Sequence, residues 1–108
     1  MKSILVVSTP DIPGQEIEST LGLVRGSTIR ARNIGRDIGA MLKGIVGGEI
    51  KDYTKLLADA REEALSRMKK DAESLGADAV VNLRFTTSTV MQTTSEILAY
   101  GTAVKLKN

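Results

Sequence analysis

The sequence contains no cysteine, no histidine and no tryptophan among its 108 residues. The chain therefore has no thiolate nucleophile, no disulfide, no histidine base and no Cys/His ligands for zinc or an iron–sulfur cluster. Its longest early apolar run, Ile4–Val7, is too short for the core of a signal peptide. No stretch approaches the ~20 apolar residues of a membrane span. We expect a cytoplasmic protein, in agreement with the absence of cysteine.

Aromatic residues are also scarce, with one phenylalanine and two tyrosines. The core must therefore consist of aliphatic side chains and methionine, which bury less area per residue than aromatic rings. We expect residues 1–108 to form a single domain, which hides roughly two thirds of its unfolded surface on folding. Burial against further copies would supply the missing core area, so we expect a homo-oligomer.

The charge is nearly balanced, because 15 Lys and Arg oppose 13 Asp and Glu to give a formal net charge of +2. Without histidine this charge hardly changes between pH 5 and 8, so a pH switch is not expected. The fractions of hydrophobic residues (42%) and charged residues (26%) are those of an ordinary folded domain.

Four segments have the pattern of β-strands. Ile4–Ser8 is a short apolar run that ends at a turn containing both prolines. The pattern of residues 16–31 predicts a second strand, with a bulge or bend near Gly26. Residues 80–86 and 97–106 alternate with a period of two. Both faces of residues 97–103 are apolar or small, which predicts a helix against one face and a neighbouring subunit against the other.

Two segments have helical spacing. Residues 33–48 predict a short helix, and residues 52–75 predict a long amphipathic helix that ends at Gly76. Alanines on its apolar stripe indicate a close approach to a sheet. The expected stripe is Tyr53, Leu56, Leu57, Ala60, Ala64, Met68, Ala72 and Leu75. We therefore predict an α+β fold in two layers, an antiparallel sheet packed by one long helix plus a short helix.

The candidate ligand-binding residues lie around the short helix. Asn33, Arg36 and Asp37 are three and four residues apart and share one face of a helical turn. They could bind a small polar or anionic ligand, or Asn33 could cap the helix beside an ion pair. Gly47 and Gly48 precede the long helix, where free N–H groups could hold an anion or form a hinge. Carboxylates spaced for acid/base chemistry are absent, so we expect no enzymatic activity and no cofactor.

Arginines and lysine gather in the stretch Arg25, Arg30, Arg32, Arg36 and Lys43. The stretch could attract phosphates, or it could be a solvated edge or an interface. Nucleic-acid binding is disfavoured because the stretch has no aromatic residues for stacking.

A hard cation could bind Asp59 and Glu63, which lie four residues apart. The same two carboxylates also belong to an i, i+4 ladder with Lys55 and Arg67, which predicts ion pairs instead.

These segments, in this order, resemble the YbjQ-like family, whose usual label is heavy-metal-binding. The resemblance rests on Leu21–Gly26, Ala31–Asp37, Ile45–Gly48, Tyr53, Leu57, Ala60–Arg61, Ala64, Leu75–Val81 and Gly101–Val104. It implies a small subunit with an antiparallel sheet and one long helix, assembled as a ring-shaped homopentamer. It transfers no metal ligands to this sequence, and Arg84–Ser88 replace the acidic pattern expected of many relatives. The leading hypothesis is a non-enzymatic homo-oligomer that binds a small polar ligand at subunit boundaries. The alternative is metal binding.

Overall fold

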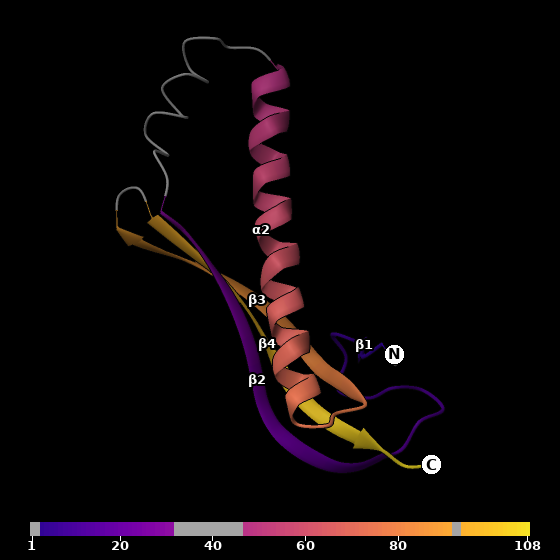
Figure 1. Cartoon of the computed structure of the whole chain (residues 1–108). Coiled ribbons are helices and arrows are strands. Elements are labelled where there is room, and N and C mark those ends of the chain that lie inside the picture. Colours follow the sequence, from indigo (N-terminus) through magenta and orange to yellow (C-terminus); the bar gives the residue numbers. More distant parts are fainter. Residues whose placement is uncertain (1–2, 32–46, 92–93) are drawn as a thin grey trace.

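The computed structural model describes residues 3–31, 47–91 and 94–108. Its elements are β1 (Leu5–Val6), β2 (Ile17–Ala31), α2 (Gly47–Ser74), β3 (Ala79–Met91) and β4 (Thr94–Leu106). The strands form one sheet in the order β1-β3-β4-β2, and α2 lies along one face of it (Figure 1). The predicted α+β class and long helix are confirmed. Most of the expected short helix, at residues 32–46, lies outside the described residues.

The sheet is mixed, so the prediction of an antiparallel sheet is wrong for β1. Strands β2 and β3 both pair antiparallel with β4, whereas β1 pairs parallel with β3. The chain passes through β2 and α2 before it reaches β3, and so long a crossover permits parallel pairing. The pairing continues past β1, since Val7 N donates to Val80 O at 2.9 Å and Leu83 N donates to Val7 O at 3.0 Å.

Strand β2 is long and irregular, but not where the sequence predicted. Its register against β4 shifts between Ile17 and Ser19 and between Thr20 and Gly22. The φ of Gly22 is 126°, a conformation open to glycine. No register shift occurs at Gly26, so a bulge at that position is wrong. Gly26 instead lies directly under α2, where a side chain would meet the helix backbone.

Helix α2 begins at Gly47, five residues before the predicted start at Asp52. Each glycine costs about 1 kcal/mol relative to alanine inside a helix, which does not stop a helix of this length. The predicted end at Gly76 is confirmed. Gly76 has a φ of 76°, Gly76 N donates to Glu73 O at 3.0 Å, and Ala77 N donates to Ala72 O at 3.1 Å. These two hydrogen bonds are those of a Schellman motif.

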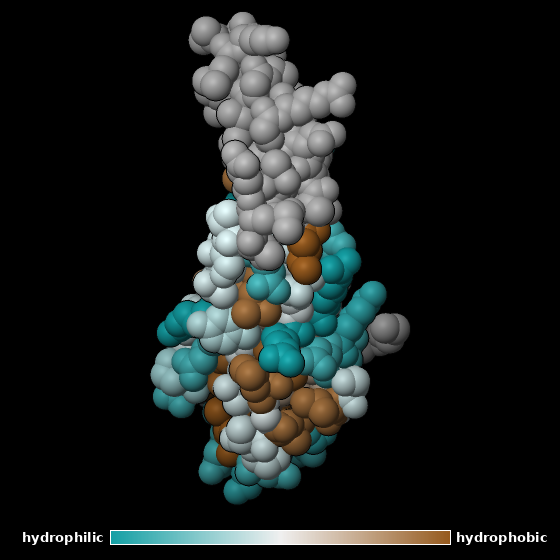
Figure 2. All heavy atoms as spheres, turned by 90° about the vertical axis from the view of Figure 1, so that its left-hand side faces the viewer, coloured by the Kyte–Doolittle hydropathy of each residue, from teal (hydrophilic) through white to brown (hydrophobic). Residues whose placement is uncertain are grey.

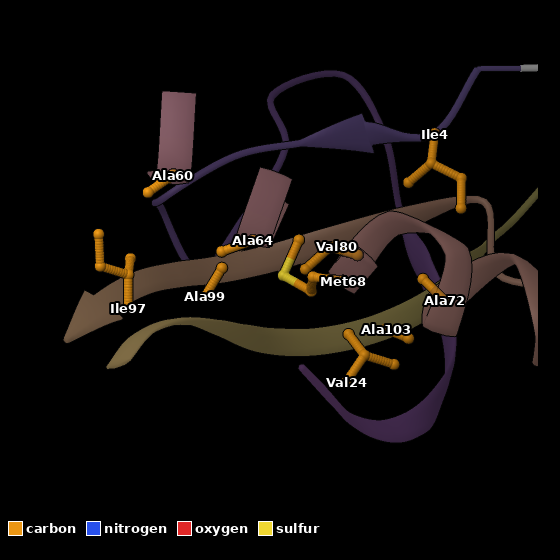
Figure 3. Packing of buried hydrophobic residues seen from close by; sticks show 10 residues of the cluster. All are labelled: Ile4, Val24, Ala60, Ala64, Met68, Ala72, Val80, Ile97, Ala99 and Ala103. Atoms are coloured by element: carbon orange, nitrogen blue, oxygen red, sulfur yellow. The ribbon is translucent and has the colours of Figure 1, made fainter. Parts of the chain in front are cut away.

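The main core lies between α2 and the sheet, as Figure 3 shows. The central part of the predicted stripe is confirmed, because four of its residues are fully buried: Ala60, Ala64, Met68 and Ala72. Leu57 and Leu75 were predicted on the same stripe but are 37% and 46% exposed. Leu75 follows the last residue of α2. In Figure 1 the far ends of β2, β3 and β4 turn away from the N-terminal half of α2, where Leu57 lies.

A bulge in β3 changes which of its residues share a face. Asn82 has a φ of 57°, and the register against β4 breaks between Val81 and Arg84. Asparagine is among the non-glycine residues that tolerate this conformation. Val81 lies opposite Thr102, whereas Phe85 lies opposite the buried Ala99. The predicted simple alternation of Val81 and Phe85 on one face is therefore wrong.

A second, smaller core lies on the sheet face away from α2. It contains Ile12, Ala79, Val81 and Val104, all buried. The outer face of β4 at Val104 is thus covered by the chain's own Ile12. The neighbouring subunit was predicted against residues 97–103, just before Val104, and stays a prediction. Farther along the same face, Leu98 and Tyr100 are half-buried.

Candidate functional site

Of the predicted ligand-binding residues, the structure describes Gly47 and Gly48. Gly47 and Gly48 are the first two residues of α2, so they do not form the expected loop or hinge before it. Asn33, Arg36 and Asp37 lie in residues 32–46, outside the described residues. The structure therefore supplies other candidate surfaces, which lie on the sheet.

The free edge of β2 is closed in its middle by two side chains of α2. Arg25 N donates to Asp71 Oδ2 at 3.1 Å, and Arg67 Nη1 donates to Ser27 O at 2.6 Å. Main-chain groups at a free edge otherwise offer pairing sites to another strand. The two helix side chains occupy these groups, so this part of β2 is blocked to strand addition. No sequence pattern predicts this arrangement, because it depends on how α2 lies over the sheet.

One carboxylate of α2, that of Glu63, forms an ion pair within the helix. Arg67 Nη2 contacts Glu63 Oε1 at 2.6 Å, which confirms the last pair of the predicted ladder. Within residues 3–31, 47–91 and 94–108, no three Asp or Glu side chains gather as a metal site would require. Among these residues, no third acidic side chain joins Asp59 and Glu63.

Two arginines flank a tyrosine on the sheet face away from α2. Arg84 lies opposite Tyr100 in the β3–β4 register, and Arg25 lies opposite Tyr100 in the β2–β4 register. Neighbours of Tyr100 along β4, Ala99 and Gly101, are buried on the α2 side, so Tyr100 and both arginines face away from the helix. Arg84 Nη1 donates to Ser8 O and to Leu83 O, both at 2.8 Å. The sequence indicated Arg25 alone, because joining the three residues requires the register.

Large apolar side chains are exposed at two separate places on the sheet. Leu23 and Ile29 of β2 are 64% and 58% exposed, and Phe85 of β3 is 42% exposed. Beyond Leu83, β3 has no strand on its outer side within the described part of the chain. Figure 2, a view from the left-hand side of Figure 1, shows apolar atoms gathered mainly in the lower half among polar ones.

A family model described as "Putative heavy-metal-binding" matches residues 4–107. The chain belongs to the YbjQ-like family. A UPF0145 protein of Photobacterium profundum is 61% identical over 103 residues, covering 95% of this chain and all of that protein. A UPF0145 protein of Archaeoglobus fulgidus is 57% identical over 106 residues, covering 98% of each chain. The expected family membership is confirmed.

A solved structure shows the same fold at much lower sequence identity. It is a protein with unknown function of the DUF74 family from Pediococcus pentosaceus, 17% identical, with a TM-score of 0.65. The match covers 96% of this chain and 98% of that one. The names of the two UPF0145 relatives state no enzymatic activity. Among the described residues, no helix is long and apolar enough to cross a membrane.

Proposed function

We propose that this YbjQ-like protein is a non-enzymatic, cytoplasmic homo-oligomer, assembled as a ring-shaped pentamer. The observation that supports assembly is the exposure of large apolar side chains at two different places, Leu23 with Ile29 on β2 and Phe85 on β3. Full burial of one such side chain contributes about 1.5–3 kcal/mol. Contact with another copy would supply the area that the alanine-rich core lacks.

The two apolar places suit a head-to-tail contact. The β2 surface, defined by Leu23 and Ile29, and the β3 surface, defined by Phe85 and the open edge beside it, differ in sequence and position. When one copy offers its β2 surface to the β3 surface of the next, every copy keeps one surface free for a further copy. Such heterologous contacts close into a ring when the rotation permits. The family resemblance sets the expected number at five.

Aspartate at either surface is expected to prevent assembly. The wild-type protein should sediment at micromolar concentration with about five times the 11.6 kDa mass of one chain. L23D and F85D should each sediment as single chains, because each places a charge in the apolar contact. L75D is the matched control, since Leu75 is also exposed, at 46%, but lies just beyond the end of α2. A wild-type mass of 11.6 kDa would overturn the proposal.

Mixing the two variants tests the head-to-tail arrangement. L23D keeps an intact β3 surface and F85D keeps an intact β2 surface, so an equimolar mixture should form two-chain complexes that grow no further. An isologous contact would behave differently, because the variant with the intact self-complementary surface would pair with itself. Absence of any complex in the mixture, with both variants folded, would rule out the head-to-tail contact.

The proposal includes a ligand at the subunit boundaries. A small polar or anionic molecule would bind Asn33, Arg36 and Asp37, which the sequence spacing puts on one helical face. Gly47 and Gly48, at the start of α2, would lie alongside with main-chain N–H groups that have no intrahelical partner. An amide, a guanidinium and a carboxylate together suit a ligand with both donors and acceptors.

Metal binding is the second candidate, because the description of the matching family model names it. The chain has no cysteine or histidine, and its described residues contain no group of three acidic side chains. We therefore expect equilibrium dialysis against micromolar copper, zinc and cadmium to show no stoichiometric uptake. Uptake of one metal ion per chain or per ring would establish the alternative.

A further inference from the structure

We propose that the side chains of Arg67 and Asp71 keep a second copy of the chain from adding a strand to the edge of β2. We call these two side chains the edge block. The strand that they exclude is β3 of the other copy. The inference goes beyond the proposed function, because it concerns the main-chain edges of the sheet in each chain, whatever its assembly.

The edge block occupies main-chain groups that a docking strand would need. Arg25 N donates to Asp71 Oδ2 at 3.1 Å, and Ser27 O accepts from Arg67 Nη1 at 2.6 Å. Arg25 and Ser27 are two residues apart in β2, so their main-chain groups point out of the same edge. A docking strand would lie about 4.8 Å from β2, in the space that these side-chain atoms fill.

A second contact holds Arg67 at the edge. Arg67 Nη2 lies 2.6 Å from Glu63 Oε1, one helical turn earlier. Because the guanidinium is planar and rigid, Nη1 and Nη2 can contact Ser27 and Glu63 at the same time. Glu63 therefore positions the arginine of the edge block, and the guanidinium is fixed between α2 and β2.

The rest of the β2 edge offers only irregular or short stretches to another strand. Before Arg25, the register against β4 shifts between Ile17 and Ser19 and again between Thr20 and Gly22. After Ser27, only residues 28–31 of β2 remain. A strand has about 5–6 residues on average. A block in the middle is therefore enough to protect the whole edge.

The opposite edge of the sheet, at β3, has no such protection. Beyond Leu83, the described residues place no strand on the outer side of β3. Residues 85–91 contain no charge, no proline and no glycine, and residues 85–89 are exposed. Lysine, proline or a covering segment usually protects such an edge. An uncharged segment of good strand formers readily pairs with another strand, so this edge suits an open β2 edge of another copy.

Blocking one of the two edges limits how far edge pairing can extend. If both edges were open, each added copy would present a new free edge, and an open filament would grow. With β2 blocked, a β3 edge can pair only with the β3 edge of one other copy, which stops at two chains. The edge block thus explains how the chain tolerates an unprotected β3 edge.

Removal of the edge block in R67A/D71A is expected to produce filaments. Thioflavin T fluorescence should rise about tenfold or more, and most of the protein should pellet on sedimentation. The matched control R61A/E73A removes the same two charges from α2. Arg61 and Glu73 are exposed and make no hydrogen bond with the described residues of β2, so this control should sediment like wild type. Sedimentation of R67A/D71A like wild type would overturn the proposal.

T87P identifies the strand that adds. Arg25 and Arg84 lie opposite Tyr100 from its two sides. Because Arg25 N points away from β4, the main-chain groups of Tyr100 point toward Arg84, and those of Thr87 point out of the free edge. Proline at position 87 therefore removes an edge donor without breaking the pairing of β3 with β4. R67A/D71A/T87P should sediment like T87P alone and show no rise in thioflavin T fluorescence.

M68A separates the edge block from stability. It removes a buried side chain and keeps both residues of the edge block, so it should not form filaments while its circular dichroism spectrum stays native. A rise in thioflavin T fluorescence as large in M68A as in R67A/D71A would trace filaments to lost stability and contradict the proposal. Filaments of R67A/D71A/T87P would contradict it too, because another segment would then be adding. Each comparison is with wild type in the assembled state that it has, so the result does not depend on a ring.

Discussion

G26A is expected to lower the free energy of unfolding by about 3–5 kcal/mol, near the upper end for a single substitution. Gly26 lies under α2, and a Cβ there would fall 2.7 Å from the carbonyl carbon of Arg67 and closer still to Met68 N and Ala64 O. All three atoms belong to the helix backbone, so no side-chain rotation relieves the clash. The helix would have to move away from β2, which would loosen the packing of the alanine stripe. Urea unfolding of wild type and variant measures the difference.

T28V is the matched control, two positions along the same strand and on the same face. Thr28 is 2% exposed, and its Oγ1 makes no hydrogen bond with the described residues. Valine has nearly the same shape and removes a buried hydroxyl that lacks a partner, so stability should stay equal or rise by about 1 kcal/mol. If G26A and T28V had the same urea midpoint, β2 and α2 could not lie as close together at Gly26 as the structure has them.

The parts of the fold that the sequence predicted correctly depend on local spacing. Alanines and Met68 recur every four residues, and this period puts them on one helical face whatever the helix packs against. Gly76 ends α2 because glycine readily adopts the positive φ of the Schellman motif. The limits of the buried stripe were predicted less well. Leu57 and Leu75 keep the helical period, but the sheet turns away from the half of α2 that holds Leu57 (Figure 1), and Leu75 follows the last residue of the helix.

The features that were missed depend on how distant strands align. The parallel pairing of β1 with β3 follows from a long crossover, which periodicity does not encode. The bulge at Asn82 moves Phe85 to the α2 side of the sheet, and one asparagine in a strand gives only a weak signal for it. The row of Arg84, Tyr100 and Arg25 joins residues from three strands, so a slip of one position in either pairing would separate them.

The short side chains between α2 and the sheet determine which surfaces of the sheet stay exposed. Because alanines and Gly26 let α2 approach the sheet closely, Arg67 and Asp71 reach the edge of β2 and close it at Ser27 and Arg25. The helix covers one face of the sheet and the middle of one edge. Leu23 and Ile29 on the opposite face and Phe85 on β3 stay exposed, and these are the surfaces that we propose contact another copy.

M68A is expected to lower the free energy of unfolding by about 2–5 kcal/mol. Met68 has the largest fully buried side chain of the described residues. Its neighbours on the helix face are Ala64 and Ala72, which are too short to fill the cavity that alanine would leave (Figure 3). The cost therefore includes both the lost burial and an uncollapsed void.

M68L separates volume from chemistry at the same position. Leucine nearly conserves the volume of methionine, so the expected loss is below about 1.5 kcal/mol. Urea unfolding of both variants, each compared with wild type, gives the two differences, and sedimentation at micromolar concentration shows whether the assembled state is retained. If M68A and M68L lowered the free energy of unfolding equally, the stability of the core at position 68 would not depend on side-chain volume. A large loss in M68A alone would confirm that the volume of Met68 is needed. The neighbouring alanines are too small to fill this part of the core, and the chain has few aromatic side chains that could do so.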